Sequence, residues 1–199
     1  TPESRALRHL FMAERAASKI ADVPANTPQR EIRSVAVIGA GTMGGGIAMN
    51  FLNAGLPVTL LETTQQALDR GLATIRKNYE AQVSKGKLKP EKYEQRMALL
   101  TTTLSYEDLK SADLIIEAVF ENVELKAKVT QEAEAYLADN GIFASNTSTL
   151  PISGLANASQ DQAKFIGLHF FSPVDKMQLV EIIKGKNTSA ETLAKAYDY

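Results

Sequence analysis

The feature that most constrains the fold of this chain is the glycine-rich hexamer Gly39-Ala40-Gly41-Thr42-Met43-Gly44. Residues 34–38 precede it and are almost all apolar, which is typical of a parallel strand that is covered on both faces. A helical stretch over 43–53 follows, and a second apolar run over 58–61 ends at Glu62. This succession predicts a β-α-β unit that carries the glycines in its first turn.

The three glycines of the hexamer each suit a different part of a dinucleotide-binding turn. Gly39 permits a tight turn from strand to helix, and Gly41 allows the backbone to approach a pyrophosphate. Gly44 allows the helix to lie close to the sheet. The N-terminus of that helix would present unpaired N–H groups and the positive end of its dipole to the phosphates. A tight turn without a ligand is the alternative, and the strand before the glycines and the helix after them favour the dinucleotide.

Glu62 lies about 20 residues after Gly41, at the end of the second predicted strand. A carboxylate at this position can accept hydrogen bonds from the ribose hydroxyls of the adenosine, and it would repel a 2′-phosphate. We therefore expect NAD rather than NADP as the cofactor. The alternative is that Glu62 only begins a solvated loop.

The rest of the chain alternates between helical and strand-like segments. Helical periodicity covers 68–83, 91–99 and 124–137, with a break at 85–90. Strand-like runs cover 99–104, 113–119, 141–145, 165–171 and 179–183. The alternation predicts an α/β fold with a doubly wound, mostly parallel sheet of the Rossmann type. The helices after the second strand form a longer excursion than a crossover needs.

The first 29 residues are predicted to lie outside this sheet. Apolar residues recur there at helical spacing, namely Leu7, Leu10, Phe11, Ala17 and Ile20. This stripe must pack either on this domain or on a neighbouring one, and 21–29, with its two prolines, is typical of a linker. We expect a linker helix and linker over 1–29, a nucleotide-binding domain over 30–187, and over 188–199 the start of a helix that leads to a further domain. Because the chain starts at Thr1 and stops inside a predicted helix, we expect a piece of a longer protein.

Composition excludes several classes of function. The net charge is −1, so no excess of basic residues favours nucleic acid or an anionic membrane as a partner. The chain has no cysteine, which excludes disulfides, zinc–thiolate sites and thiol nucleophiles. No apolar run reaches the roughly 18 residues of a transmembrane helix, and no cluster of His, Asp and Glu has the spacing of metal ligands. We therefore expect no metal, no nucleic acid and no membrane insertion.

Polar residues occur at three places where the strands of the second half of the chain end or are interrupted. These are Asn146-Thr147-Ser148 after the strand at 141–145, His169 in an otherwise apolar run, and Glu181 between apolar neighbours. Ligands of open parallel sheets bind beyond the carboxyl ends of the strands. The sequence therefore predicts that these groups face a common cleft.

Glu181 and His169 are the candidates for acid–base chemistry. A carboxylate within an apolar strand needs a partner, and Ser172-Pro173 can turn the chain back so that the two side chains meet. The carboxylate would fix the tautomer of the imidazole and raise its basicity, as a general base requires. The alternative is a satisfied core histidine and a solvent-facing glutamate on an edge strand. Ser148 has no nearby histidine and no G-x-S-x-G elbow, so we expect it to hydrogen-bond a substrate oxygen rather than to act as a nucleophile.

Five segments together resemble the NAD-binding domain of the L-3-hydroxyacyl-CoA dehydrogenases, from about residue 34 to residue 186. They are the glycine hexamer, Glu117-Ala118-Val119-Phe120-Glu121-Asn122, Ser145-Asn146-Thr147-Ser148, His169-Phe170-Phe171-Ser172-Pro173-Val174 and Leu179-Val180-Glu181-Ile182-Ile183. Phe11-Met12-Ala13-Glu14-Arg15 resembles the linker helix of multifunctional β-oxidation proteins, in which an enoyl-CoA hydratase domain precedes the dehydrogenase.

The resemblance implies roles for individual residues. His169 would take the hydroxyl proton, Glu181 would orient His169, and Ser148 would hydrogen-bond the reacting oxygen. Asn146, Glu121 and Lys126 would lie around the nicotinamide and its ribose. The implied cofactor contacts are Gly39, Gly41, Thr42, Met43, Gly44, Glu62, Ala118, Val119, Glu121, Lys126 and Asn146. The implied reaction transfers a hydride from an L-3-hydroxyacyl-CoA to NAD and gives a 3-ketoacyl-CoA.

The resemblance has departures and a wider context. Glu62 stands where the family often has Asp, Ser172 where Asn is common, and Thr149 where a second Ser is frequent. The family also has a C-terminal helical domain that completes the substrate site and usually forms a dimer. The implied partners are thus an acyl-CoA, an upstream hydratase, this downstream domain and a second copy. The implied location is cytoplasmic in a bacterium, or peroxisomal or mitochondrial in a eukaryote. Two alternatives remain, an NAD-binding module without turnover and a short-chain 3-hydroxybutyryl-CoA dehydrogenase.

Overall fold

The structure is a computed structural model of the chain, and it describes all residues except 18–22, 25, 29–30 and 198–199. The strands are β1 Val35–Ile38, β2 Val58–Leu61, β3 Leu100–Thr103, β4 Ala112–Glu117, β5 Leu137–Ser145, β6 Phe165–Phe170 and β7 Val180–Lys184. The longer helices are α1 Pro2–Ala17, α2 Thr42–Asn53, α3 Gln65–Ser84, α4 Pro90–Ala98, α5 Val123–Ala133 and α7 Ala190–Tyr197. Shorter turns of helix are α6 Ile152–Leu155, η1 Tyr106–Leu109, η2 Glu134–Tyr136, η3 Ala156–Ala158 and η4 Gln162–Lys164.

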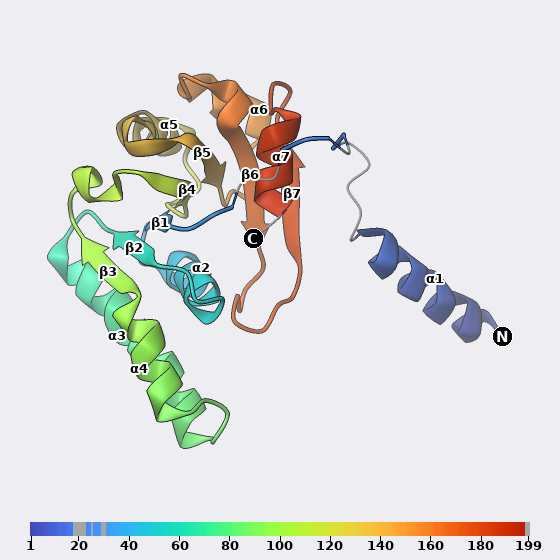
Figure 1. Cartoon of the computed structure of the whole chain (residues 1–199), viewed down its shortest axis with the longest axis horizontal. Helices are drawn as coiled ribbons and strands as arrows, with labels where there is room; N and C mark the ends of the chain where they lie inside the picture. Colours follow the sequence, from blue (N-terminus) through green and yellow to red (C-terminus); the bar gives the residue numbers. More distant parts are fainter. Residues whose placement is uncertain (18–22, 25, 29–30, 198–199) are drawn as a thin grey trace.

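The strands form one sheet in the order β3-β2-β1-β4-β5-β6-β7 (Figure 1). The pairs from β3 to β6 are parallel, and only β7 runs antiparallel, against β6. The chain leaves β1 toward β2 on one side and later returns to β4 on the other side. The order therefore reverses beside β1, and a crevice opens there beyond the carboxyl ends of the strands. The predicted doubly wound α/β sheet is confirmed.

The sheet is covered on both faces, which explains why its central strands are apolar without alternation. Val35 and Val37 of β1 join the apolar cluster under α2, α3 and α7. Ala36 and Ile38 join the cluster under α5 and α6 on the opposite face. Figure 1 shows α2 and α3 on one side of the strands and α5 and α6 on the other. Each buried aliphatic side chain of this kind stabilises the fold by about 1.5–3 kcal/mol.

The structure differs from the predicted boundaries around α5 and β5. The helical pattern predicts a helix to residue 137, but α5 ends at Ala133, and a short 3₁₀ turn, η2, follows it. Leu137 instead begins β5 and pairs with Ala112 of β4, ahead of a register shift. A long-range strand contact thus outweighs local helical periodicity, so β5 is longer than its apolar part, 141–145.

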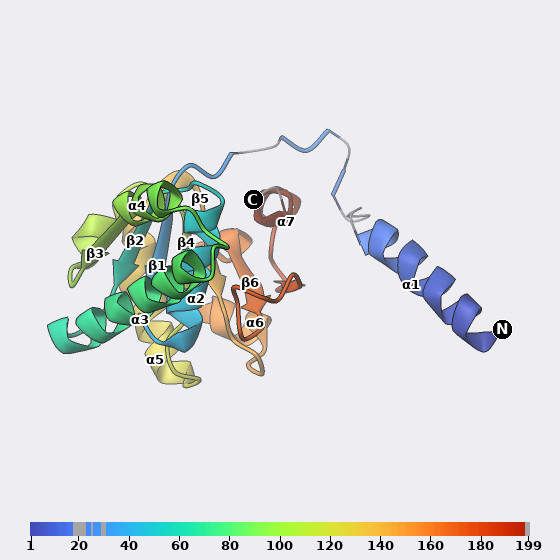
Figure 2. The same ribbon diagram turned by 90° about the horizontal axis from the view of Figure 1, so that it is seen from below.

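The two terminal helices differ in their packing. Helix α7 lies on this domain, because Leu193 and Ala196 are buried in the cluster that also holds β6 residues. That the chain leads beyond α7 to a further domain stays a prediction. Every residue of α1 is exposed, including the predicted stripe of Leu7, Leu10 and Phe11. Figure 2 shows α1 apart from the sheet and its covering helices. Ile20 and much of the predicted linker lie outside the described residues.

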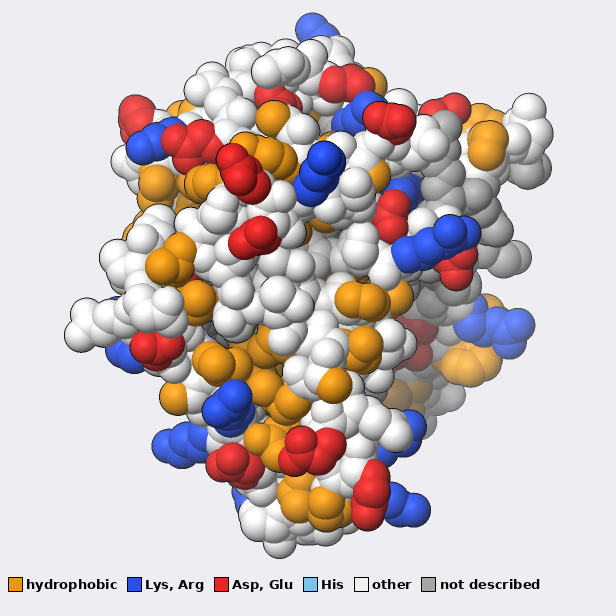
Figure 3. Space-filling model, turned by 60° about the vertical axis from the view of Figure 1, so that its left-hand side comes forward, with side chains coloured by type: hydrophobic (Ala, Val, Ile, Leu, Met, Phe, Trp, Pro, Cys, Tyr) orange, Lys and Arg blue, Asp and Glu red, His pale blue; other side chains and the backbone are white. Residues whose placement is uncertain are grey.

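Two further features concern the described part of the chain only. It contains no helix that is both long and apolar enough to cross a membrane, and no cluster of three or more potential metal-ligating His, Cys, Asp or Glu residues. On the face that Figure 3 shows, acidic and basic side chains are interspersed, in keeping with a net charge of −1.

Candidate active site

The glycine turn between β1 and α2 is shaped by close backbone contacts. Gly39 has a φ of +100°, and a Cβ there would lie 2.9 Å from the carbonyl oxygen of Ala118, which follows β4. A Cβ on Gly44 would lie 1.7 Å from the carbonyl oxygen of Gly39. Only glycine at these two positions lets α2 begin so close to the turn. The tight turn and the close approach of the helix are as the sequence predicts.

Gly41 has a different environment from the other two glycines. A Cβ on Gly41 would meet no protein atom within 4 Å, and its φ of −69° suits any residue. Gly41 is the N-cap of α2 and gives that helix no side-chain cap, so the first N–H groups of α2 are left for another acceptor. The absence of a side chain at Gly41 therefore leaves room for a group that approaches the N-terminus of α2 from outside, as a pyrophosphate would.

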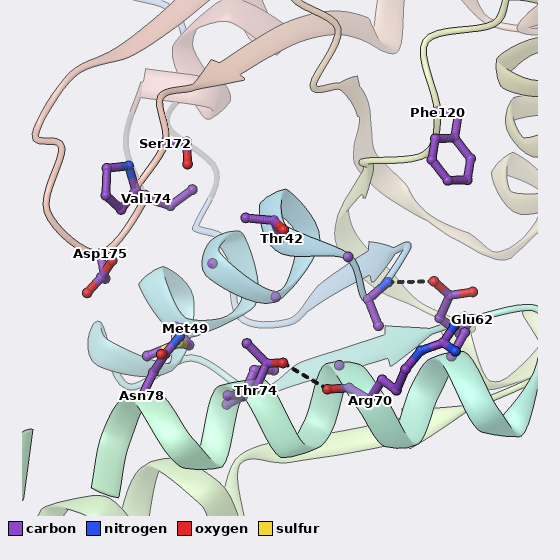
Figure 4. Close-up of a pocket in the computed structure, with 18 of the residues that line it drawn as sticks. Thr42, Met49, Glu62, Arg70, Thr74, Asn78, Phe120, Ser172, Val174 and Asp175 are labelled. Atoms are coloured by element: carbon purple, nitrogen blue, oxygen red, sulfur yellow. Dashed lines mark hydrogen bonds between the residues drawn. The ribbon is translucent and has the colours of Figure 1, made fainter. Parts of the chain in front are cut away.

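A groove of about 520 Å³ runs from this turn along α2 and α3 (Figure 4). At its end lies Glu62, whose Oε1 accepts a hydrogen bond from the Ala40 N–H at 2.9 Å and whose Oε2 accepts one from the Thr63 N–H at 2.8 Å. A carboxylate has about four acceptor positions, so Glu62 keeps capacity for ribose hydroxyls while it fixes the turn. Phe120 and Arg70, which the sequence analysis does not single out, also line the groove.

A second cavity of about 340 Å³ adjoins the groove at Ser172. It brings together residues predicted from separate parts of the sequence. Its walls include Met43, Ala118, Val119, Glu121, Asn146, Ser148 and His169. These residues follow β1, β4 and β5 or lie on β6, so the carboxyl end of the sheet gathers them, as open parallel sheets do.

His169 and Glu181 are direct cross-strand partners of β6 and β7. The Nδ1 atom of His169 lies 2.8 Å from Oε2 of Glu181. In the neutral imidazole this contact places the proton on Nδ1 and leaves Nε2 as an acceptor. The Glu181 side chain is 52% exposed, because β7 is an edge strand, so the predicted contact exists together with the solvent-facing glutamate of the alternative.

Glu121 holds the turn that carries Ser148. Its Oε1 accepts hydrogen bonds from the N–H groups of Ser148 and Thr149, at 2.9 and 3.1 Å, and from the hydroxyls of Thr147 and Thr149. Partial burial would raise the pKa of Glu121, but these hydrogen bonds and the Lys126 ammonium outweigh it and lower the pKa to about 2. Glu121 is therefore ionised at neutral pH and binds the turn firmly.

Lys126 is the predicted cofactor residue whose position differs most from the expectation. Its side chain is only 2% exposed and is not among the residues that line the two cavities. Its ammonium lies 2.9 Å from a carboxylate oxygen of Glu117 and 3.3 Å from one of Glu121. Lys126 thus lies behind the cavity wall, where it contacts Glu121 and the carbonyl oxygen of Val119, which both line the cavity.

Glu117 is a functional candidate that the sequence analysis does not identify by itself. It ends β4, its side chain is fully buried, and it accepts hydrogen bonds from Lys126, from the Ser145 hydroxyl and from the Val119 N–H. Burial raises the pKa of its carboxyl, against the opposing effect of Lys126. A glutamate directly after the apolar run of β4 is the signal that could have indicated it.

Two contacts join the cofactor side of the site to the catalytic side. The Oδ1 atom of Asn146 accepts a hydrogen bond at 2.9 Å from the N–H of Phe170, next to His169. A Cβ on Gly46 of α2 would lie 2.9 Å from Val174, a buried residue of the loop between β6 and β7. The loop that links His169 to Glu181 therefore rests directly on the helix that begins at the glycine turn.

Comparisons with known proteins agree with this geometry. A family model for the 3-hydroxyacyl-CoA dehydrogenase, NAD binding domain matches residues 34–199. The (S)-3-hydroxybutyryl-CoA dehydrogenase PaaH1 from Ralstonia eutropha is 37% identical, with a TM-score of 0.77 over 83% of this chain and 62% of its own. FadB2 from M. tuberculosis is 36% identical, with a TM-score of 0.80 over 83% of this chain and 59% of its own. The dehydrogenase part of multifunctional enzyme 1 from C. elegans is 30% identical, with a TM-score of 0.79 over 91% of this chain and 44% of its own.

The chain thus spans 44% to 62% of the length of these three structures. The matched residues include the glycine turn, both cavities and the pair of His169 and Glu181. The turn also fits a dinucleotide on its own geometry, because Gly41 leaves the approach to the N-terminus of α2 open. NAD is therefore the cofactor, and the chain belongs to the 3-hydroxyacyl-CoA dehydrogenase family, with residues 34–199 as its NAD-binding domain.

Proposed function

We propose that this chain is the cofactor-binding part of an enzyme that oxidises an L-3-hydroxyacyl-CoA to a 3-ketoacyl-CoA with NAD, in fatty-acid β-oxidation. The observation that carries the proposal is the 2.8 Å contact between His169 and Glu181 in a cavity that adjoins the dinucleotide groove. An imidazole whose Nδ1–H is held by a carboxylate presents a basic Nε2, which suits removal of a hydroxyl proton near neutral pH.

His169, Glu181 and Ser148 have separate roles at the C3 hydroxyl of the substrate. His169 accepts the hydroxyl proton at Nε2, and Glu181 holds the ring in position and stabilises the imidazolium that results. Ser148 donates a hydrogen bond to the C3 oxygen and keeps it close to His169. When bound, NAD supplies the acceptor for the C3 hydrogen and its electron pair. Ala118, Val119 and Phe171 line the same cavity.

Two observations bear on the wider protein. The match to the C. elegans multifunctional enzyme covers 91% of this chain, whereas the match to PaaH1 covers 83%. The longer match and the unpacked apolar stripe of α1 favour a multifunctional β-oxidation protein, in which an upstream hydratase domain covers α1 and a downstream helical domain completes the substrate site. In that protein a second copy would bind through the downstream domain, and the location would be cytoplasmic in a bacterium, or peroxisomal or mitochondrial in a eukaryote.

A second candidate function is an NAD-binding module that turns over nothing by itself. The family match favours it, because that match describes an NAD-binding domain over residues 34–199. A third, a 3-hydroxybutyryl-CoA dehydrogenase of short-chain substrates, is favoured by the name of PaaH1.

One set of assays separates these candidates. Acetoacetyl-CoA and NADH are mixed with this chain and with the full-length protein, and the loss of NADH absorbance is followed. Turnover by the full-length protein over several acyl lengths supports β-oxidation, and turnover of the four-carbon substrate alone supports the short-chain enzyme. NADH binding without turnover by either protein would contradict the proposed dehydrogenase and leave the binding module.

A further inference from the structure

The buried carboxylate of Glu117 has no direct contact with either cavity, yet it is linked to the turn that carries Ser148. Its two oxygens lie 3.0 and 2.9 Å from the ammonium of Lys126. The side chains of both residues are at most 2% exposed. A buried charge is costly unless it is paired, so each of these two groups fixes the position of the other.

Lys126 also contacts Glu121 and Val119, which line the second cavity. The same ammonium lies 3.3 Å from Oε2 of Glu121 and 3.4 Å from the carbonyl oxygen of Val119. Glu121 in turn uses its other oxygen, Oε1, to accept the hydrogen bonds of residues 147–149. The two oxygens of Glu121 are thus divided, one toward the buried ammonium and one toward the turn of Ser148.

Glu117 also contacts Ser145 and Asn146, which begin the same turn. Glu117 and Ser145 are register partners of β4 and β5, and the Ser145 hydroxyl donates to the Glu117 carboxylate. The Ser145 Oγ also accepts from the Thr147 N–H at 3.3 Å, and the Glu117 carbonyl accepts from the Asn146 N–H at 2.9 Å. Residues 145–149 are therefore held from two sides by groups that converge on Glu117.

We propose that Glu117 is a positioning residue of the active site, which acts through Lys126 and Glu121 to fix the place of Ser148 in the cavity. The inference rests on the proposed function, because it assigns Glu117 to the step in which Ser148 holds the reacting oxygen. It also applies to the cofactor, because Glu121 lines the same cavity as Val119 and Asn146.

The first test is the variant Glu117→Gln, which keeps the size of the side chain and removes its charge. The Lys126 ammonium then loses the carboxylate that fixes its position, so it no longer holds Oε2 of Glu121 in place and the turn of Ser148 is less firmly held. We expect NADH binding by this chain to weaken about tenfold, as for a lost hydrogen bond to a charged group. In the full-length protein we expect kcat to fall by roughly 10²-fold with a smaller change in KM for the acyl-CoA. Unchanged NADH affinity and unchanged kcat would overturn the proposal.

A double-mutant cycle with Ser148→Ala tests the route of the effect. If Glu117 acts through Ser148, Ser148→Ala lowers kcat in the wild-type background and changes it little in the Glu117→Gln background. If the two losses multiply, Glu117 acts by another route and the proposal is wrong. The NADH affinity is measured without turnover. If only the dehydrogenase assignment is wrong, Glu117→Gln still weakens NADH binding although no turnover is seen. If the positioning role is wrong, Glu117→Gln leaves the NADH affinity and kcat unchanged.

Loss of stability is separated from loss of positioning by a second variant. In Glu117→Gln/Lys126→Met no buried charge is left without a partner, so we expect the thermal stability to recover toward wild type. Glu121 has still lost its contact with Lys126, so we expect kcat to stay low. Recovery of kcat together with stability would show a purely structural role and overturn the proposal.

Lys195→Met is the matched control, because Lys195 is as buried as Lys126. Its ammonium donates to the Asn140 carbonyl oxygen, away from the two cavities. Lys195→Met should therefore leave the NADH affinity unchanged.

Discussion

The carbonyl oxygen of Gly39 lies 1.7 Å from the point that a Cβ on Gly44 would occupy, whereas a Cβ on Gly41 would meet no atom within 4 Å. Gly44→Ala should therefore lower the free energy of unfolding by at least about 1–3 kcal/mol, as overpacking does. Gly41→Ala should lower it by only about 0.5–1 kcal/mol, because alanine is a poorer N-cap than glycine, and should still weaken NAD binding. Thermal denaturation and NADH titration of both variants check this pair. Equal loss of stability in the two variants would contradict it.

His169→Ala should lower the turnover of the full-length protein by roughly 10²–10⁴-fold, as loss of a general base does. NADH affinity should remain near the wild-type value, because His169 lies on the substrate side of the cavity. Steady-state kinetics and NADH titration measure the two effects. The chain offers a matched control in its other histidine, His9, which is exposed on α1, so His9→Ala should leave both quantities unchanged. Retained turnover in His169→Ala would remove this residue from the mechanism.

Glu181→Gln should reduce turnover while it leaves cofactor binding intact. The variant retains a hydrogen-bonding group beside Nδ1 of His169 but removes the charge that stabilises the imidazolium. Steady-state kinetics and NADH titration of the full-length variant measure the two effects. Wild-type turnover would show that Glu181 only supports the strand pair.

NAD should bind more tightly than NADP, because Glu62 would place a negative charge beside a 2′-phosphate. In Glu62→Gln the charge is removed while the amide oxygen can still accept from the Ala40 N–H, so the difference between the two affinities should narrow. Titration of the wild-type chain and the variant with both cofactors checks this. Tighter binding of NADP than of NAD by the wild type would contradict the assignment.

The pKa of Glu121, lowered from 4.5 to about 2, makes a prediction for stability at acidic pH. A carboxyl whose pKa is lower in the folded state contributes stability above its ordinary pKa and loses it as the pH falls through the folded value. The free-energy difference between the wild type and Glu121→Gln should thus be constant above about pH 5 and shrink between pH 4.5 and 2. Denaturation of both proteins across this range measures it. A difference that does not depend on pH would contradict the role of Glu121 in holding the turn.

The sequence predicts the sheet well because its strands are unambiguous in their local pattern. The runs at 34–38, 58–61 and 113–119 are mostly apolar, and each becomes an inner strand whose side chains are largely buried on both faces of the sheet. The start of β5 could not be read in this way, because Leu137 fits the helical pattern before it. Its pairing with Ala112 depends on a strand far away in the sequence.

The site is predicted less completely than the fold, and the charged residues show why. The contact of His169 with Glu181 joins two strands that are adjacent in sequence, so their spacing allows it without deciding against the alternative of a core histidine. The burial of Lys126 depends on two carboxylates, of which Glu117 is fully buried at the end of β4. The sequence shows three charged residues but not which of them face solvent. The place of Lys126 beside the cofactor, which the resemblance implies, stays a prediction.

The contact between Gly46 and Val174 limits how this domain can diverge. A larger side chain at position 46 would push the hairpin of β6 and β7 outward and tilt the proton acceptor relative to the cofactor, without touching either. A change in the hairpin would likewise press on the helix whose first turn faces the phosphates. Variants that retune acyl specificity should therefore accumulate at positions far from this contact, and substitutions at residues 46 and 174 should be tolerated only as compensating pairs.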